Sequence, residues 1–270
     1  MSAEGIHLEI REKIGIITIN RPSRRNAFNA FMFAELARVT GELRANMPRV
    51  VVITGAGDKA FSAGFDVNPD NPLVMTMHEA MGKNDHQGLV DGMKVVRDAV
   101  DAFVALPVPI IAAINGLAYG GGAELSSRCD LRVMDRDAVV CFSEVRLGLM
   151  PDWGGGAALS RLVGAARAAD LVLTARKVSA DEALQLGFAN RVSEKGRCLE
   201  DALALAQAIS ANGPRAVRHA LAVIRQSRNM TLDQSLAMEL DEAVALVESG
   251  ECVHGITAFL EKRAAKFPDI

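Results

Sequence analysis

The sequence has little of what marks several large classes of protein. Its four cysteines, Cys129, Cys141, Cys198 and Cys252, form no C-x-x-C pair, so neither a disulfide framework nor a zinc site is expected. The net charge is −3, and no block of lysine and arginine occurs, which argues against a nucleic-acid or membrane-surface partner. These absences predict a cytoplasmic protein whose cysteines are reduced and mostly buried.

Long apolar runs are also missing. The most apolar stretch, PVPIIAAINGLAYGGGAEL, is interrupted by Asn115 and by several glycines, and is too short to span a bilayer. The amino-terminal MSAEGIHLEIREKIGIITIN mixes acids and bases from the start, unlike a signal peptide. Half of the 270 residues are hydrophobic and 23% are charged, which is typical of a globular protein with a sizeable core.

Residues 1–198 show alternating strand and helix patterns, which predict an α/β core. IHLEIREKIGIITINRP alternates apolar and polar residues and predicts a β-hairpin that ends at Pro22. The other expected elements are a helix at 31–46, a strand at 50–57, a helix at 91–106, a strand at 107–116, a helix from 121, a strand at 130–144 and a helix at 157–175.

Two further segments differ from this pattern. Residues 67–90 are rich in Pro, Asn and Met with weak periodicity, and we interpret them as a mobile loop with a helical turn. Residues 199–270 show helical periodicity throughout, in LEDALALAQAISANG, PRAVRHALAVIRQS, LDQSLAMELDEAVALVES and ECVHGITAFLEKRAAKF. We therefore predict an α/β core followed by a helical carboxy-terminal region.

A glycine cluster at GLAYGGGAEL lies between a predicted strand and a predicted helix. Backbone N–H groups at such a helix start favour a developing negative charge. In KAFSAGFD, Gly64 permits close backbone approach, so the Phe65 N–H is a second candidate donor. Two such donors directed at one point form an oxyanion hole. The alternative is a tight turn in which Glu124 merely complements the helix dipole.

Three carboxylates are candidates for proton transfer: Glu124, and the Glu144 and Asp152 of FSEVRLGLMPDWGGG. A carboxylate serves this purpose when partial burial raises its pKa towards neutrality, and no metal is required. The patterns GxGxxG and GxxxxGK[ST] are absent, which disfavours a nucleotide-dependent oxidoreductase. A Ser–His hydrolase is weakly supported, because GxSxG does not occur, and none of the histidines stands in the zinc-protease pattern HExxH.

Four segments together resemble the crotonase (enoyl-CoA hydratase/isomerase) superfamily: KAFSAGFD, INGLAYGGGAELSSRCDLRV, FSEVRLGLMPDWGGG and AFLEKRAAKF. The resemblance covers nearly the whole chain. It implies a spiral of ββα units in residues 1–198, followed by a helical trimerisation region in residues 199–270. It also implies a homotrimer or a homohexamer of two trimers, and an acyl-CoA thioester as the substrate, with no other cofactor.

The resemblance also implies roles for particular residues. The N–H groups of Phe65 and Gly121 would form the oxyanion hole that holds the thioester carbonyl. The residues implied in binding CoA are Arg24, Arg25, Ala60, Phe61 and Ala63, with Phe259 and Lys262 contributed by a neighbouring subunit. For Arg24 and Arg25 a solvated turn is the alternative interpretation.

Two reactions are consistent with this set of acids. Hydratases of the family resemble this chain in carrying glutamates at the positions of Glu124 and Glu144; Glu124 would activate water and Glu144 would exchange a proton at C2. Hydratases usually have glycine in place of Asp152, however, and an acid there resembles the isomerase branches. The dienoyl-CoA isomerases share the turn E-V-x-x-G-L-x-x-D but have Asp in place of Glu124.

We therefore expect a hydratase of 2-enoyl-CoA thioesters. The alternatives are an isomerase of 3-enoyl- or dienoyl-CoA that uses Glu144 and Asp152, and a non-catalytic crotonase-like binding subunit. The methionines of residues 67–90 and Trp153 are candidates for the wall of the acyl pocket, and equally for ordinary core.

Overall fold

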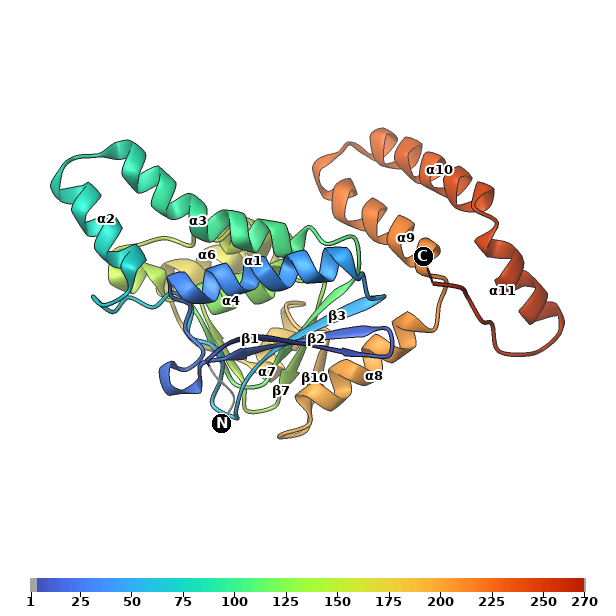
Figure 1. Ribbon diagram of the computed structural model, residues 1–270, viewed down its shortest axis with the longest axis horizontal. Coiled ribbons are helices and arrows are strands. Elements are labelled where there is room, and N and C mark those ends of the chain that lie inside the picture. The colour runs from blue at the N-terminus through green and yellow to red at the C-terminus, as the bar shows by residue number, and fades with distance from the viewer. Residues whose placement is uncertain (1–3, 270) are drawn as a thin grey trace.

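The larger of two β-sheets forms the centre of the molecule (Figure 1). The computed structural model describes residues 4–269. The six strands of this sheet lie in the order β1-β2-β3-β5-β7-β10. Strands β1 and β2 are antiparallel, as the predicted hairpin requires, and the other neighbours are parallel. The strand bounds are β1 Gly5–Arg11, β2 Ile14–Asn20, β3 Val50–Gly55, β5 Ile110–Ile114, β7 Leu131–Asp135 and β10 Arg191–Ser193.

A smaller sheet of short strands has the order β4-β6-β8-β9. Its strands are β4 Ala60–Ser62, β6 Leu117–Tyr119, β8 Val139–Cys141 and β9 Val178–Ser179. Strands β4, β6 and β8 follow β3, β5 and β7 within a few residues, and each is then followed by a helix. The chain therefore repeats a strand–strand–helix unit, which is the predicted ββα spiral.

The helices of the α/β region surround these sheets. They are α1 Ala30–Ala45, α2 Pro72–Gly82, α3 His86–Val104, α4 Gly121–Arg128, α5 Gly155–Val163, α6 Ala165–Thr174, α7 Ala180–Gln185 and α8 Cys198–Ser210. Short 3₁₀ turns occupy η1 Pro22–Arg24, η2 Glu144–Leu147 and, later in the chain, η3 Ser227–Asn229. Helices α1 and α3 lie side by side across the molecule (Figure 1).

The period-two alternation of strand side chains divides the core into two layers. On β3, Val51 and Ile53 face the cluster that includes α1 and α3, whereas Val50 and Val52 face α8. Because both faces of β3 are covered, its sequence is continuously apolar rather than alternating.

The prediction of a mobile loop at residues 67–90 was wrong. Helix α2 and the start of α3 occupy most of this segment. Asn71 caps α2 by accepting a hydrogen bond from the Leu73 N–H, and Pro72 takes the first position of the helix, where proline is tolerated. Asp85 caps α3 through the Gly88 N–H. The cap residues lie among Pro and Asn residues, which are also typical of loops, and for this reason the sequence pattern did not reveal where the two helices begin.

Two predicted elements are each divided in the structure. The strand expected at 130–144 is β7 and β8, separated by a turn at residues 136–138. The helix expected at 157–175 is α5 and α6, which meet at Gly164 with a φ of +84°. A left-handed backbone angle ends a helix, and the apolar periodicity on either side did not reveal the break.

The last three helices, α9 Pro214–Gln226, α10 Leu232–Glu248 and α11 Glu251–Leu260, stand away from the sheets and form what we call the arm (Figure 1). Helix α8 lies almost wholly within residues 199–270, which were predicted as a separate helical region. It nevertheless packs on the large sheet. In the described chain, no single helix is long and apolar enough to cross a membrane, and α10 with α11 would suffice only as a pair bent by 73°.

Two arginines join the arm and the tail to the core. Arg225 of α9 pairs with Asp130 at 2.6 Å and donates to the Leu106 carbonyl at 2.7 Å. Arg49, next to the start of β3, donates to the Phe267 carbonyl at 2.7 Å and pairs with Asp269 at 2.8 Å. The arm is thus fixed at its base and at its end, while its outer surface stays open to contact.

Candidate active site

The backbone segments at Gly64 and Gly121 approach each other too closely for side chains. A β-carbon built on Gly64 would lie 2.6 Å from the Gly121 nitrogen and 2.7 Å from the Tyr119 oxygen. The φ of Gly64 is +84°, an angle that glycine adopts without strain. The loop after β4 therefore lies against the start of α4, which brings the two predicted donor residues, Phe65 and Gly121, into one region.

Phe28 fixes the direction of the Phe65 peptide. The Phe28 N–H donates to the Gly64 carbonyl and the Asp66 N–H donates to the Phe28 carbonyl, each at 2.8 Å, and this pair forms a parallel β-bridge. The N–H of Phe65 itself consequently points to the opposite side. Gly121 is the first residue of α4, where an N–H has no acceptor within the helix. Within residues 4–269 neither N–H has a hydrogen-bond acceptor.

A buried ion pair holds the same loop in place. Arg21 Nη1 lies 2.6 Å from Asp66 Oδ2, and their side chains are only 10% and 3% exposed. Ser62 also serves the loop, because its hydroxyl donates to the Asn26 carbonyl and accepts from the Gly64 N–H. Ser62 is therefore a structural residue of this loop.

Glu124 joins α4 to the turn at residues 152–155. The residue is 1% exposed. Its Oε1 accepts from the Asp152 N–H at 3.2 Å and its Oε2 accepts from the Gly155 N–H at 2.8 Å. Gly155 allows this approach, since a β-carbon there would lie 2.4 Å from the Glu124 side chain. One carboxylate thus receives two backbone donors from the turn.

Glu144 lies opposite, at the start of η2. It is 8% exposed, and in the described chain neither carboxylate oxygen has a hydrogen-bond partner. A β-carbon on Gly120 would lie 3.6 Å from its Oε1, so the carboxyl faces the glycine cluster. An unpartnered buried carboxylate is costly, which indicates a group arranged for a bound molecule rather than for stability.

Burial changes the proton affinity of both glutamates. It raises the pKa of Glu124 to about 8, and the neighbouring Glu144 carboxyl adds to this effect. Burial likewise raises the pKa of Glu144, with a contribution from the charge of Asp152. Two neighbouring carboxyls that raise each other's proton affinity do not readily ionise together near neutral pH, so the pair is expected to titrate as one unit. The arrangement suits proton delivery and removal.

Asp152 lies beside the glutamates but in a different environment. The residue is exposed in the single chain, yet desolvation by its neighbours raises the pKa of its carboxyl. Its charge acts on both glutamates, since it contributes to raising the pKa of Glu124 and of Glu144. The structure therefore gathers all three predicted acids around the start of α4.

Trp153 is part of the core beneath the glycine cluster. It is 3% exposed and packs edge-on against Phe28 and Phe33, with ring centroids 5.7 Å and 5.2 Å away. A β-carbon on Gly121 would lie 2.5 Å from its ring. The Trp153 ring therefore packs against the start of α4 from the side of the hydrophobic core.

The residues predicted to bind CoA lie at two separate places. Arg25 and Ala60 line one cavity of about 160 Å³, and the Arg25 carbonyl accepts the Ala63 N–H at 2.9 Å. Phe61 is fully buried. Arg24 is 44% exposed and lies 3.8 Å from Asp70, as in the solvated-turn interpretation.

Phe259 lies on α11 of the arm and Lys262 just beyond the end of this helix, and Figure 1 shows α11 well separated from α4, which carries Glu124. Phe259 is 80% exposed. Within one chain, therefore, the structure does not bring these two residues to the site. Their predicted contact with CoA requires a neighbouring subunit.

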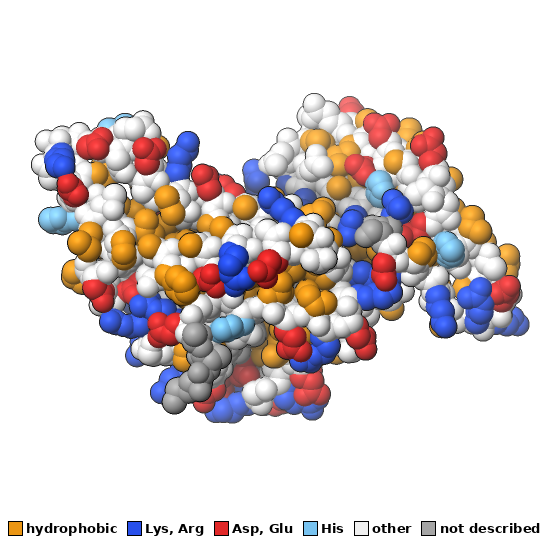
Figure 2. Space-filling view, viewed as in Figure 1, with side chains coloured by type: hydrophobic (Ala, Val, Ile, Leu, Met, Phe, Trp, Pro, Cys, Tyr) orange, Lys and Arg blue, Asp and Glu red, His pale blue; other side chains and the backbone are white. Residues whose placement is uncertain are grey.

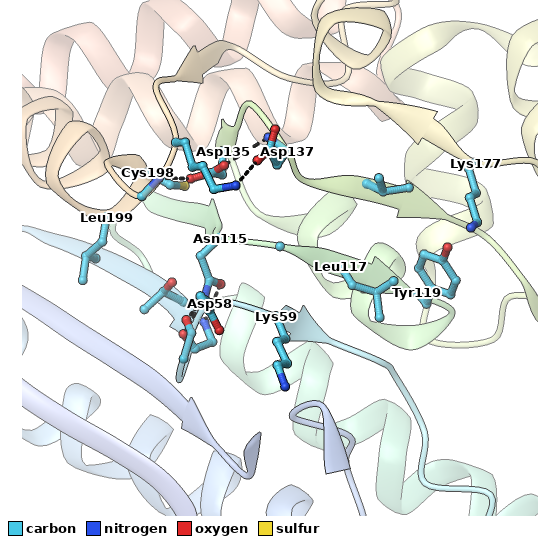
Figure 3. Close-up of a pocket in the computed structure, with 17 residues that line it drawn as sticks. Asp58, Lys59, Asn115, Leu117, Tyr119, Asp135, Asp137, Lys177, Cys198 and Leu199 are labelled. Carbon is cyan, nitrogen blue, oxygen red and sulfur yellow. Dashed lines mark hydrogen bonds and ion pairs between the residues drawn. The ribbon is translucent and has the colours of Figure 1, made fainter. Parts of the chain in front are cut away.

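A cavity of about 680 Å³ lies away from the three acids, at the carboxyl ends of β3, β5 and β7. Its lining includes Lys59 and Lys177 (Figure 3). Lys195 also lines it and is paired with Asp137 at 2.7 Å. Lys59 also lines the smaller cavity beside Arg25. Sequence reasoning did not identify Lys59, because its place between two cavities follows only from the packing of the loop.

Hydrophobic side chains gather on the face that carries α2 and the adjoining parts of α1 and α3 (Figure 2). The exposed apolar residues of these helices are Phe31, Met75, Met81, Met93 and Val95. Met77 instead packs against Gly92 of α3. The methionines of the predicted wall for the acyl group are thus exposed or only partly buried, and their contact with substrate stays a prediction.

Comparison with known proteins identifies the family. The model of the enoyl-CoA hydratase/isomerase family matches residues 9–269. The chain belongs to the enoyl-CoA hydratase/isomerase family. The predicted crotonase fold is confirmed by an enoyl-CoA hydratase structure from Bacillus anthracis, which matches with a TM-score of 0.87 at 33% identity, covering 97% of this chain and 98% of that one.

Curated relatives extend over the same length. A short-chain-enoyl-CoA hydratase from Clostridium acetobutylicum is 35% identical, with 97% of each chain covered. A crotonyl-CoA hydratase from Syntrophomonas wolfei is 36% identical, with 99% of each covered. Membership of the family makes a CoA thioester the class of substrate.

Two arginines at this family site were missed by sequence reasoning. Arg97 Nη1 donates to the Asp152 carbonyl at 3.2 Å, and Arg128 Nη1 donates to the Trp153 carbonyl at 2.8 Å. The spacing of Glu124 and Arg128, four residues apart on one helix, was the available sign that both face the same neighbour.

Proposed function

We propose that this protein hydrates 2-enoyl-CoA thioesters, adding water across the carbon–carbon double bond. The observation that carries the proposal is the pair of buried glutamates, Glu124 and Glu144, beside two backbone N–H groups without acceptors. The hydratase names of the full-length relatives support it.

The geometry supports the following sequence of events. The N–H groups of Phe65 and Gly121 hold the thioester oxygen, where negative charge grows as the enolate forms. Glu124 takes a proton from water as the water oxygen bonds to C3, and Glu144 gives a proton to C2. The carboxyl pair then holds the same number of protons as before, and transfer between the two carboxyls restores the starting state.

The test compares the purified protein on crotonyl-CoA, a 3-enoyl-CoA and a 3,5-dienoyl-CoA. We expect hydration of crotonyl-CoA, and a loss of about 10²-fold or more in kcat for Glu124→Gln and for Glu144→Gln. Isomerisation that needs Asp152, together with no hydration by the wild type, would refute the proposal.

Isomerisation is the second candidate, and Asp152 is the observation that favours it. Desolvation raises the pKa of this carboxyl, so a third acid is available along the acyl chain. An isomerase would use Glu144 and Asp152 to remove a proton at one carbon and return it at another. Asp152→Asn separates the two reactions, because it would abolish isomerisation and leave the hydration chemistry of the two glutamates in place.

The proposal extends to CoA binding and assembly. We propose that Arg24, Arg25 and the backbone of Ala60, Phe61 and Ala63 contact the CoA portion, as the family resemblance implies. The exposed apolar residues of the arm support assembly as a homotrimer or homohexamer, in which Phe259 and Lys262 would reach the CoA of a neighbouring subunit.

We further propose a cytoplasmic enzyme that needs no metal or cofactor beyond its CoA substrate. The free cysteines support the location, since Cys129, Cys141 and Cys198 are buried and unpaired as thiols. Dialysis against EDTA is expected to leave hydration of crotonyl-CoA unchanged. A loss of activity that added metal restores would contradict this.

A further inference from the structure

We propose that Arg128 and Arg97 are positioning residues which, joined by Asp101, hold the turn at residues 152–155 from its outer side. The inference rests on the proposed role of Glu124, which binds the same turn from the inner side. Together these contacts fix the distance between the turn and the carboxylate that is proposed to activate water.

Each side of the turn is held by a different kind of backbone group. On the inner side, the N–H groups of Asp152 and Gly155 donate to the Glu124 carboxylate. On the outer side, the Asp152 carbonyl accepts from Arg97 and the Trp153 carbonyl accepts from Arg128. The turn therefore cannot move towards or away from Glu124 without breaking a charge-assisted hydrogen bond.

Helix geometry explains how α4 contacts both the inner and the outer side of the turn. Glu124 and Arg128 are four residues apart on α4, and so they project from the same face of the helix, one turn apart. Gly154, in the turn, has a φ of +87°. A β-carbon on Gly154 would lie 3.2 Å from Arg128 Nη1, so the absence of a side chain leaves room for the guanidinium beside the turn.

Asp101 joins the two arginines. It pairs with Arg128 and also accepts from Arg97 Nε, at 3.1 Å to both carboxylate oxygens. Arg97 and Asp101 are again four residues apart, here on α3. Arg128 is 17% exposed as a side chain, so this end of the network is largely shielded from water. Helix α3 is thereby connected to the turn twice, directly through Arg97 and indirectly through Arg128 of α4.

The charged groups around Glu124 belong to several elements. The acids that act on it are Glu144 of η2 and Asp152 of the turn. The other charged groups on the packed helices are Arg97 and Asp101 of α3, Arg128 of α4 and Arg161 of α5. The hydrogen bond from the Gly155 N–H favours the ionised form of Glu124 and so lowers its pKa. Displacement of the turn would weaken this bond and raise the pKa of Glu124 further.

The test uses Arg128→Met and Arg97→Met, with Arg128→Lys as the conservative variant. We expect Arg128→Met to lower kcat for hydration by about tenfold or more, because small misplacements of a catalytic group are costly, while KM for the CoA substrate changes little. The acidic limb of the pH–rate profile should move to higher pH. Arg97→Met should do the same to a smaller degree, and Arg128→Lys should restore part of both effects.

Arg161→Met is the matched control. Arg161 lines the same cavity of about 250 Å³ as Arg97 and Arg128, but in the described chain it has no hydrogen bond to the turn. The Arg161→Met substitution therefore removes a nearby positive charge without breaking a hydrogen bond to the turn. The variant is expected to keep the wild-type kcat and pH profile.

Three outcomes would overturn the inference. A folded Arg128→Met with wild-type kcat and pH profile would do so, as would an equal shift in Arg161→Met. A loss of kcat in both Arg128 variants with no change in the pH profile would indicate a structural role only. Should Arg128→Met fail to fold, Arg97→Met decides alone, because Arg97 is 47% exposed. Failure of the proposed function is recognised separately, by full activity in Glu124→Gln.

Discussion

At the scale of single residues, the site depends on positions where a side chain is missing as much as on the acids. Gly64, Gly121 and Gly155 each stand where an added β-carbon would meet another atom at 2.6 Å or less. Their close packing lets two backbone N–H groups and two carboxyls share a small volume. The substitutions with the clearest expected effects are therefore at glycines and at the glutamates.

Gly121→Ala is expected to lower kcat for crotonyl-CoA hydration by about 100-fold, the cost of removing one oxyanion-hole donor. The added methyl group would lie 2.5 Å from the Trp153 ring, so the start of α4 has to move. Steady-state kinetics measures the loss. Gly41→Ala is the control, since nothing lies within 4 Å of its added β-carbon, and activity equal to that control would contradict the prediction.

Glu124→Gln is expected to increase stability relative to wild type more at pH 9 than at pH 5. The pKa of Glu124 is raised from 4.5 to about 8 in the folded protein, so the folded state binds the proton more tightly than the unfolded state. The stabilisation that comes from binding this proton is fully present below a pH of about 4.5, and it is lost as the pH rises through about 8. Thermal unfolding across this range measures it, and a Tm difference that does not vary with pH would refute the assignment.

At the scale of elements, the loop between β4 and α2 is held by a contact distant in sequence. Burial acts to raise the pKa of Asp66, but hydrogen bonds from Asn68 and Arg21 outweigh it and the pKa is lowered. The charged pair of Arg21 and Asp66 therefore fixes the loop that carries Phe65. In a buried pair, loss of one partner leaves the other charge without compensation.

Asp66→Asn is expected to destabilise the protein by about 3 kcal/mol, because buried Arg21 loses its closest carboxylate and keeps only the half-exposed Glu4, 3.3 Å from its Nε. It should also lower kcat, because the Phe65 peptide loses its support. Urea unfolding and steady-state kinetics check the two effects. Glu9→Gln is the control: it breaks the exposed pair of Arg11 and Glu9, which is worth less than about 1 kcal/mol. Equal effects of the two substitutions would contradict the prediction.

At the scale of the whole molecule, the arm exposes an apolar surface that a single chain leaves uncovered. Its exposed large hydrophobic residues on α10 and α11 are Leu232, Leu236, Leu240, Val244, Val247, Val253, Ile256, Phe259 and Leu260. A contiguous surface of this kind is typical of protein–protein contact. Assembly through the arm would also supply Phe259 and Lys262 to a second site.

Leu240→Asp is expected to shift the protein towards monomer in sedimentation-velocity experiments, because it places a charge in the apolar surface of α10. Leu240 is 65% exposed in the single chain, so folding of the chain itself should be little affected. Leu173→Asp, at an exposed site on α6, is the control and should sediment as wild type. An assembly state unchanged by Leu240→Asp would argue against contact through the arm.

The sequence by itself determined the fold class and the candidate acids. Alternation in β1 and β2, continuous apolar strands such as β3, and glycine clusters before α4 are local patterns, and local backbone preference and burial produce them. It did not reveal the helices at residues 67–90, since their caps and first turns consist of residues that also form loops.

Only the tertiary structure decided how the acids differ. Glu124 receives two backbone donors, Glu144 has none in the described chain, and Asp152 stays exposed. Hydrogen bonding and desolvation set these differences, and both depend on segments distant in the sequence that meet after folding. The contacts of Arg97 and Arg128 with the turn arise in the same way, because α3, α4 and residues 152–154 come together only in the folded chain.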